Sequence, residues 1–216
     1  MSARIVALIS IPLCRLLTSC APKINTAQSP TKRHRMASDG LSFTAMTTIP
    51  PARQPEPWMR GTLTDVPPVQ RAVLHALELG VEDIERWCSQ LSDEQLNSRP
   101  HELASVAFHI RHIIGSCDRL LSYAEGHEIT SEQLAYLKSE LESHSTRDEL
   151  LASLRSSLAD YATRVRAFTP QQYSEPRGIG RKQLPTTVAG LLVHVADHTM
   201  RHVGQAITTA KLLIAV

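Results

Sequence analysis

Apolar residues recur every three or four positions along most of this chain, a spacing that places them on one face of an α-helix. The pattern is clearest between Val66 and Leu91, behind a Pro67-Pro68 pair that is typical of a helix start. No segment rich in Val and Ile alternates apolar and polar residues as a half-buried strand would. Three more long helices are predicted at about Glu102 to Glu125, Thr146 to Phe168, and Pro185 to Leu213.

The connections between these segments predict how the helices pack. A chain of 216 residues with 42% apolar residues can bury one core in one domain. A short helical piece, SEQLAYLKSEL, lies between the second and third segments, and one long polar connection runs from Gln171 to Gln183. Long helices with short connections pack as neighbours, so we predict an all-α four-helix bundle over residues 49–216.

Residues 1–48 differ from the rest and are predicted to form a disordered extension, because they are rich in Ser, Thr and basic residues and lack an apolar period. The opening, Arg4 followed by IVALISIPLC and LLTSC, matches the pattern that precedes a lipid-modified Cys20 in bacterial lipoproteins. Alternatively, translation starts downstream, at Met36 or Met46. The first interpretation predicts an exported or lipid-anchored protein, and the second predicts a cytoplasmic one.

Charge and hydropathy exclude two classes of partner. Residues 1–48 carry a net charge of +5, and since the whole chain carries +2, residues 49–216 carry −3. A slightly acidic domain with 4% aromatic residues lacks the basic surface and the stacking rings that nucleic-acid binding requires. Beyond the N-terminal segment, no apolar run is long enough to cross a bilayer.

The cysteines favour a reducing compartment, and we therefore expect a cytoplasmic location unless Cys20 anchors the chain. Cys14 and Cys20 lie in the N-terminal extension. Cys88 and Cys117 lie inside apolar helical patterns, where a thiol packs as a small apolar group, so we expect both to be buried and unpaired.

The last helical segment contains the stretch HVADHTMRHVGQ, residues 194–205, which places His194, His198, His202 and Gln205 on one strip of the helix. A different side carries the apolar stripe Leu192, Ala196, Met200, Val203, Ile207 and Ala210. A solvated face usually contains Lys and Glu, and this strip has neither. Histidines four positions apart can share one metal ion. The spacing alone leaves both a metal site and a solvated face open.

A useful metal site needs a third ligand from another helix. The second segment offers His109 and His112 within SVAFHIRHIIGSCDRLLSY. His109 flanks the apolar stripe of that helix and His112 points away from it, but periodicity does not choose between them. Either residue is also compatible with an ordinary, hydrogen-bonded histidine at the edge of a core.

Two short motifs together resemble the signature segments of the DinB-like superfamily. In the first, Ser105 and Phe108 precede His112 by seven and four positions, and in the second, HTMRHVGQ contains His198 and His202 followed by Gly-Gln. The resemblance covers about residues 56–214 and implies a bacterial four-helix bundle that binds a divalent metal ion. It also implies that His112, His198 and His202 are the three ligands.

The resemblance leaves other residues of the strip outside the ligand set. His109 does not match the pattern. We expect His194 to lie behind the ligands or at the rim of the site. Gln205, one turn beyond the last ligand, is placed to support a ligand or to hydrogen-bond across the bundle, or it is simply a polar residue near the helix end.

The activity is predicted only as a class. Members of the superfamily resemble thiol-dependent S-transferases, maleylpyruvate isomerases or metal-dependent hydrolases. Three neutral imidazoles leave an open position, where a metal ion lowers the pKa of a water or thiol. We therefore expect a homodimeric metal-dependent transferase or hydrolase, with bound zinc or nickel, acting on a small molecule and using a low-molecular-weight thiol.

The sequence identifies no catalytic residue. Asp118, Arg119 and Tyr123 follow His112 by one to three turns, near the expected mouth of the bundle, but the sequence favours a surface or capping role for each. The alternative to an enzyme is a dimeric helical binding module whose metal is structural or absent.

Overall fold

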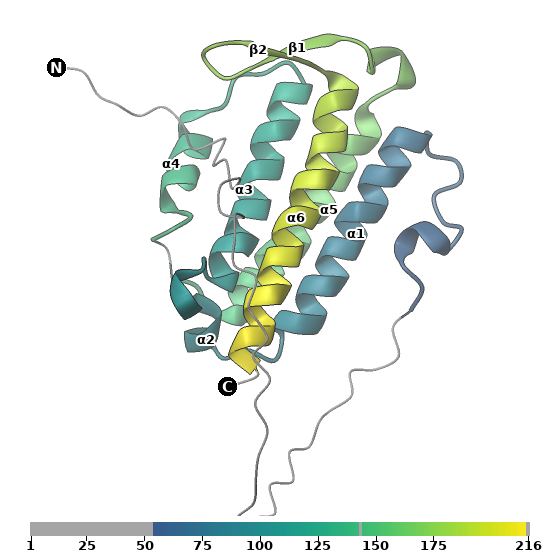
Figure 1. The fold of residues 1–216 in the computed structure, drawn as a ribbon. Helices are drawn as coiled ribbons and strands as arrows, with labels where there is room; N and C mark the ends of the chain where they lie inside the picture. Colours follow the sequence, from purple (N-terminus) through teal and green to yellow (C-terminus); the bar gives the residue numbers. More distant parts are fainter. Residues whose placement is uncertain (1–53, 143, 215–216) are drawn as a thin grey trace, which may run out of the picture. The chain divides into compact units, whose positions relative to one another are not determined.

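In the computed structural model, residues 54–142 and 144–214 are described, and they form a helical bundle with one β-hairpin at its end (Figure 1). The predicted four-helix bundle is confirmed. The prediction of a disordered segment over residues 1–48, Cys20 included, lies outside the described residues. The four long helices are α1 (Pro68–Cys88), α3 (Val106–Ala124), α5 (Arg147–Ala167) and α6 (Val188–Ile214).

Side-chain caps set the first residue of several helices. Helix α5 begins with a capping box: Glu149 N donates to Thr146 Oγ1 at 3.3 Å, and Thr146 N donates to the Glu149 carboxylate at 3.1 Å. Helix α3 begins four residues later than expected, because His101 and Glu102 have positive φ angles of 49° and 62°. Shorter helical elements are η1 (Pro57–Met59), α2 (Asp93–Asn97), η2 (Pro100–Glu102), α4 (Ser131–Ser139) and η3 (Pro170–Gln172).

The predicted helix start at Pro185 is wrong. Strands β1 (Pro176–Ile179) and β2 (Leu184–Thr187) pair antiparallel, with Pro185 opposite Gly178, and together they form the hairpin. Helix α6 starts only at Val188, where Thr187 Oγ1 accepts a hydrogen bond from Gly190 N at 3.1 Å. Each strand has four residues and none of them is fully buried, so neither shows the apolar alternation that predicts a strand.

The core lies where α6 packs against both α3 and α1, with α5 closing the bundle behind them (Figure 1). Ile84 of α1, Ile110 of α3 and Leu192 of α6 are completely buried there. Cys88 and Cys117 are also buried and unpaired, as predicted. Within residues 54–142 and 144–214, no helix combines the length and apolarity needed to cross a membrane.

Two helical glycines predict opposite effects of substitution by alanine. Nothing lies within 4 Å of the position where a Cβ on Gly204 would stand, so Gly204→Ala should raise the free energy of unfolding by about 0.5–1 kcal/mol. A Cβ on Gly115 would collide with the Glu140 carboxylate and lie 2.7 Å from Tyr136 Cδ1. Gly115→Ala should therefore lower the free energy of unfolding by about 1–3 kcal/mol. Urea denaturation of the metal-free protein measures both, and changes of the same sign would contradict this account of the packing.

Candidate metal centre

Three histidines predicted as ligands converge between α3 and α6. His112 comes from α3, and His198 and His202 come from successive turns of α6. One ring nitrogen of each lies within 4.8 Å of a ring nitrogen of the other two. The ring centroid of His202 lies 4.5 Å from that of His112 and 4.6 Å from that of His198. The chain therefore brings together the set of imidazoles that the sequence motifs single out.

Local structure at the start of α3 orients His112. Ser105 Oγ accepts a hydrogen bond from Phe108 N at 3.1 Å and so caps the helix. One turn later, the ring of His112 stacks on that of Phe108, with centroids 5.4 Å apart and planes 16° from parallel. The serine of the first motif thus fixes where the helix begins, and the aromatic residue packs against one face of the imidazole.

The spacing of the rings suits a shared metal ion. His112 Nε2 lies 3.1 Å from His198 Nε2. Tetrahedral ligands at about 2.0–2.1 Å from a zinc ion stand roughly 3.4 Å apart, so these two nitrogens are already close to the separation that a common ion requires. Two nitrogens this close cannot both carry a proton, so at least one presents a lone pair to the centre.

Hydrogen bonds on the far side of the rings show which nitrogens are left for an ion. His112 Nδ1 lies 2.7 Å from Glu140 Oε2, and His202 Nδ1 lies 3.1 Å from His109 Nδ1. His198 Nδ1 is buried and has no hydrogen-bond partner among the described residues. The Nε2 atoms of His112 and His202 therefore remain available for an ion.

Burial keeps His109, His198 and His202 neutral. Loss of solvation, together with the smaller effect of nearby His112, lowers the pKa of His109 and of His198 to about 4. The same causes lower the pKa of His202 to about 3. Neutral imidazole is the form that ligates a metal ion, so the cluster is ready to bind one at neutral pH.

Comparison with known proteins agrees with this geometry. The sequence profile of the DinB superfamily matches residues 76–206, more than half of the chain. The chain belongs to the DinB superfamily. A crystal structure titled as the conserved protein of a locus from Enterococcus faecalis is similar to this DinB-superfamily chain, with 22% identity and a TM-score of 0.55. The match covers 68% of this chain and 98% of that one, and it shows a shared fold. No curated protein matches.

Within this DinB-superfamily bundle, the two residues predicted to support the ligands lie towards solvent. The His194 side chain is 44% exposed, its Nδ1 lies 3.5 Å from Asp197 Oδ2, and its ring centroid lies 5.4 Å from that of His198. Gln205 is exposed. His194 thus stands at the rim of the cluster, and a role for either residue towards a metal stays a prediction.

The residues considered as catalytic candidates are engaged in contacts within the bundle. The Asp118 carboxylate accepts hydrogen bonds from Arg164 Nη1 at 2.6 Å and from Gln133 Nε2 at 2.7 Å. Arg119 donates to Glu140 Oε1 at 2.9 Å. Tyr123 is half-buried against the core. These contacts give Asp118 and Arg119 structural roles and identify no catalytic group.

Two residues that contact the cluster were not recognised from the sequence. The motifs leave His109 outside the ligand set, yet its Nδ1 lies 3.1 Å from His202 Nδ1. In the sequence, the position of His109 beside the apolar stripe of its helix was the one indication that its ring would lie inside the bundle. Glu140 is 2% exposed and contacts His112, although it sits in a charged stretch, LKSELE, that is typical of a solvated surface. No local signal distinguishes it.

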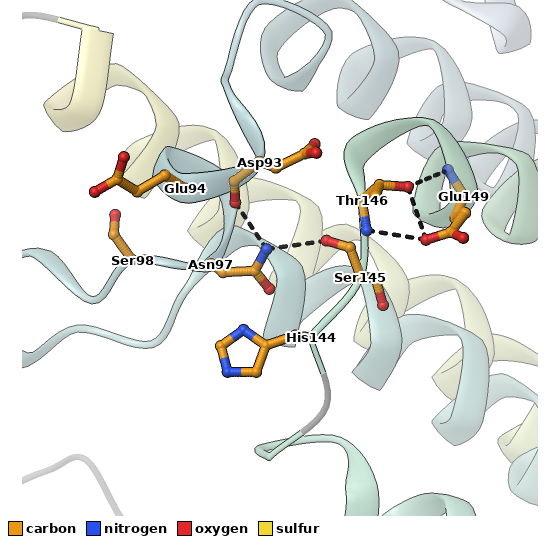
Figure 2. Close-up of a pocket in the computed structure, with 8 residues that line it drawn as sticks. All are labelled: Asp93, Glu94, Asn97, Ser98, His144, Ser145, Thr146 and Glu149. Carbon is orange, nitrogen blue, oxygen red and sulfur yellow. Dashed lines mark hydrogen bonds between the residues drawn. The ribbon is translucent and has the colours of Figure 1, made fainter.

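A separate surface pocket of about 590 Å³ lies between α2 and the start of α5 (Figure 2). Asp93, Glu94 and Glu149 give its rim acidic groups, and Asn97 Nδ2 donates to the carbonyl oxygens of Asp93 and Ser145 at 2.8 and 3.0 Å. None of the predicted ligands lines this pocket, so it is distinct from the histidine cluster.

Acidification should destabilise the metal-free protein. Histidines of the unfolded chain gain a proton near pH 6.5, about the ordinary imidazole value, whereas folded His109, His198 and His202 stay neutral down to about pH 4 or below. Between these values the unfolded state binds more protons, so the free energy of unfolding falls as the pH falls. Urea denaturation with a chelator present, at about pH 7.5, 6 and 5, measures the loss.

A variant separates this effect from general acid sensitivity. His202→Gln removes the ring with the lowest pKa, and its free energy of unfolding should therefore depend less on pH over the same range. A wild-type protein equally stable at each of these pH values would show that the rings are not held neutral by burial.

Proposed function

We propose that this DinB-superfamily protein binds one divalent metal ion through His112, His198 and His202. The observation that carries the proposal is the convergence of three ring nitrogens within 4.8 Å of one another. Burial favours the neutral rings, and contacts on the Nδ1 side of His112 and His202 leave their Nε2 atoms to face the centre. The Nε2 atoms of His112 and His198 lie 3.1 Å apart, close to the separation that a common ion requires.

We further propose that the metal is catalytic and that the protein is a transferase or hydrolase acting on a small molecule. When bound, a divalent ion with three imidazole ligands and an open position lowers the pKa of a water or thiol there. Both a hydrolysis and the attack of a low-molecular-weight thiol on an electrophile use that chemistry. Zinc and nickel both suit imidazole ligands.

Two further parts of the proposal rest on the sequence: that the protein forms a homodimer and that it works in the cytoplasm. The buried, unpaired Cys88 and Cys117 agree with a reducing compartment. Size-exclusion chromatography with light scattering tests the first, and fractionation of the native cells tests the second.

Metal content should depend on each of the three histidines. Wild-type protein incubated with zinc or nickel should retain about one ion per chain after desalting, because three imidazoles define one site. His112→Ala, His198→Ala and His202→Ala should each retain little or none, by plasma mass spectrometry.

His127→Ala is the matched control, because His127 is exposed and outside the cluster. It should bind as much metal as the wild type. His109→Ala is unsuitable as a control, since its ring contacts His202. A wild-type protein that stays metal-free after incubation would overturn the proposed site.

A catalytic metal and a structural metal differ in what their loss changes. If the metal is catalytic, His198→Ala should keep the helical circular dichroism spectrum and most of the melting temperature of the metal-free wild type, while activity towards thiol and electrophile pairs is lost. A structural metal would instead raise the melting temperature strongly on binding, because its binding free energy adds to folding. A large rise, together with no turnover of any substrate, would favour the non-enzymatic binding module.

A further inference from the structure

A buried carboxylate stands directly behind one of the three histidines. Glu140 follows the last turn of α4 and is 2% exposed. Its Oε2 lies 2.7 Å from His112 Nδ1, and its Oε1 lies 2.9 Å from Arg119 Nη1. Arg111 Nε donates to the backbone oxygen of the same residue at 3.0 Å. Every polar group of Glu140 that faces α3 is thus paired with a side chain of that helix.

Arg119 compensates the buried carboxylate. A carboxylate away from water is costly unless a cation and hydrogen bonds compensate it. The Arg119 side chain is 11% exposed and supplies that cation. An ionised Glu140 can only accept hydrogen bonds, so His112 must carry its proton on Nδ1. The lone pair of His112 is then on Nε2, the atom that faces His198 Nε2 at 3.1 Å.

The backbone of α3 is shaped to admit this carboxylate. Gly115 lies three residues after His112, and a side chain there would collide with the Glu140 carboxylate and with Arg119 Nη1. Tyr136 of α4 lies against the same glycine. The absence of a Cβ at this position allows Glu140 to reach both His112 and Arg119, which makes the contact specific to this arrangement of α3 and α4.

We propose that Glu140 is a positioning residue that fixes the tautomer and the ring orientation of His112, with Arg119 holding the carboxylate in place through its other oxygen. This inference rests on the proposed metal site and deepens it, because it assigns a role to a residue outside the histidine motifs. A carboxylate on the far nitrogen of a ligating histidine raises the basicity of the ligand and holds its ring in place. Loss of such a contact typically lowers metal affinity about 10- to 100-fold.

Isosteric substitution tests the proposal on the full chain. In Glu140→Gln the side chain keeps its size but loses its charge, and the Kd for Zn²⁺, measured by competition with a chromophoric chelator, should rise about 10- to 100-fold. Glu142→Gln is the matched control, since Glu142 is exposed and belongs to the same charged stretch. Its Kd should equal that of the wild type. An unchanged Kd in Glu140→Gln would overturn the proposal.

A second measurement needs no metal. Nitrogen-15 NMR of the imidazole side chains in the metal-free wild type should show His112 as the Nδ1–H tautomer, and Glu140→Gln should shift it towards a mixture. If Glu140→Gln fails to fold by circular dichroism, Glu140→Asp takes its place, since it keeps the charge but shortens the reach. An Nε2–H tautomer of His112 in the wild type would overturn the role of Glu140.

The two measurements separate this inference from the proposed function. A wild type that binds zinc while Glu140→Gln binds it equally well would leave the metal site standing and reject the positioning role. A wild type that binds no zinc, yet loses its Nδ1–H tautomer on substitution of Glu140, would reject the metal site and support the hydrogen-bonding role.

Discussion

The packing of α6 against α3 and α1 is the constraint on which the site depends. Thr199 is completely buried at this junction: its hydroxyl lies 3.2 Å from Cys117 Sγ of α3, and its methyl group lies against Gly80 of α1. Since Thr199 sits beside His198 in the chain, its burial sets the rotation of α6. That rotation places His198 and His202 next to α3, half-buried rather than in the core or in open solvent.

Half-burial has an electrostatic consequence for the cluster. Imidazole rings that lose part of their solvation stay neutral at pH 7, and neutral rings can approach one another without repulsion. In two of the rings the Nδ1 atom has a partner within the protein: Glu140 contacts that of His112, and His109 contacts that of His202. The Arg119 guanidinium pairs with the second oxygen of the Glu140 carboxylate and so compensates its charge.

The departures from the expected helices share one physical cause. The hairpin of β1 and β2 is short and none of its strand residues is fully buried, so these residues carry no apolar period. The late start of α3 follows from the positive φ angles at His101 and Glu102, and these residue types give no sign of such a backbone. Both features depend on how the chain turns between helices, and apolar periodicity does not report on that.

The sequence by itself determined the four long helices and the pairing of His198 with His202, because both are encoded at short range. Apolar spacing marks a helix face, and His198 and His202 are held together by one turn of a single helix. Only the tertiary structure decided what stands behind those rings. Glu140 is 28 positions from His112, and His109 is 93 positions from His202. Contacts over such separations depend on where packing of the core places whole helices, which no local pattern specifies.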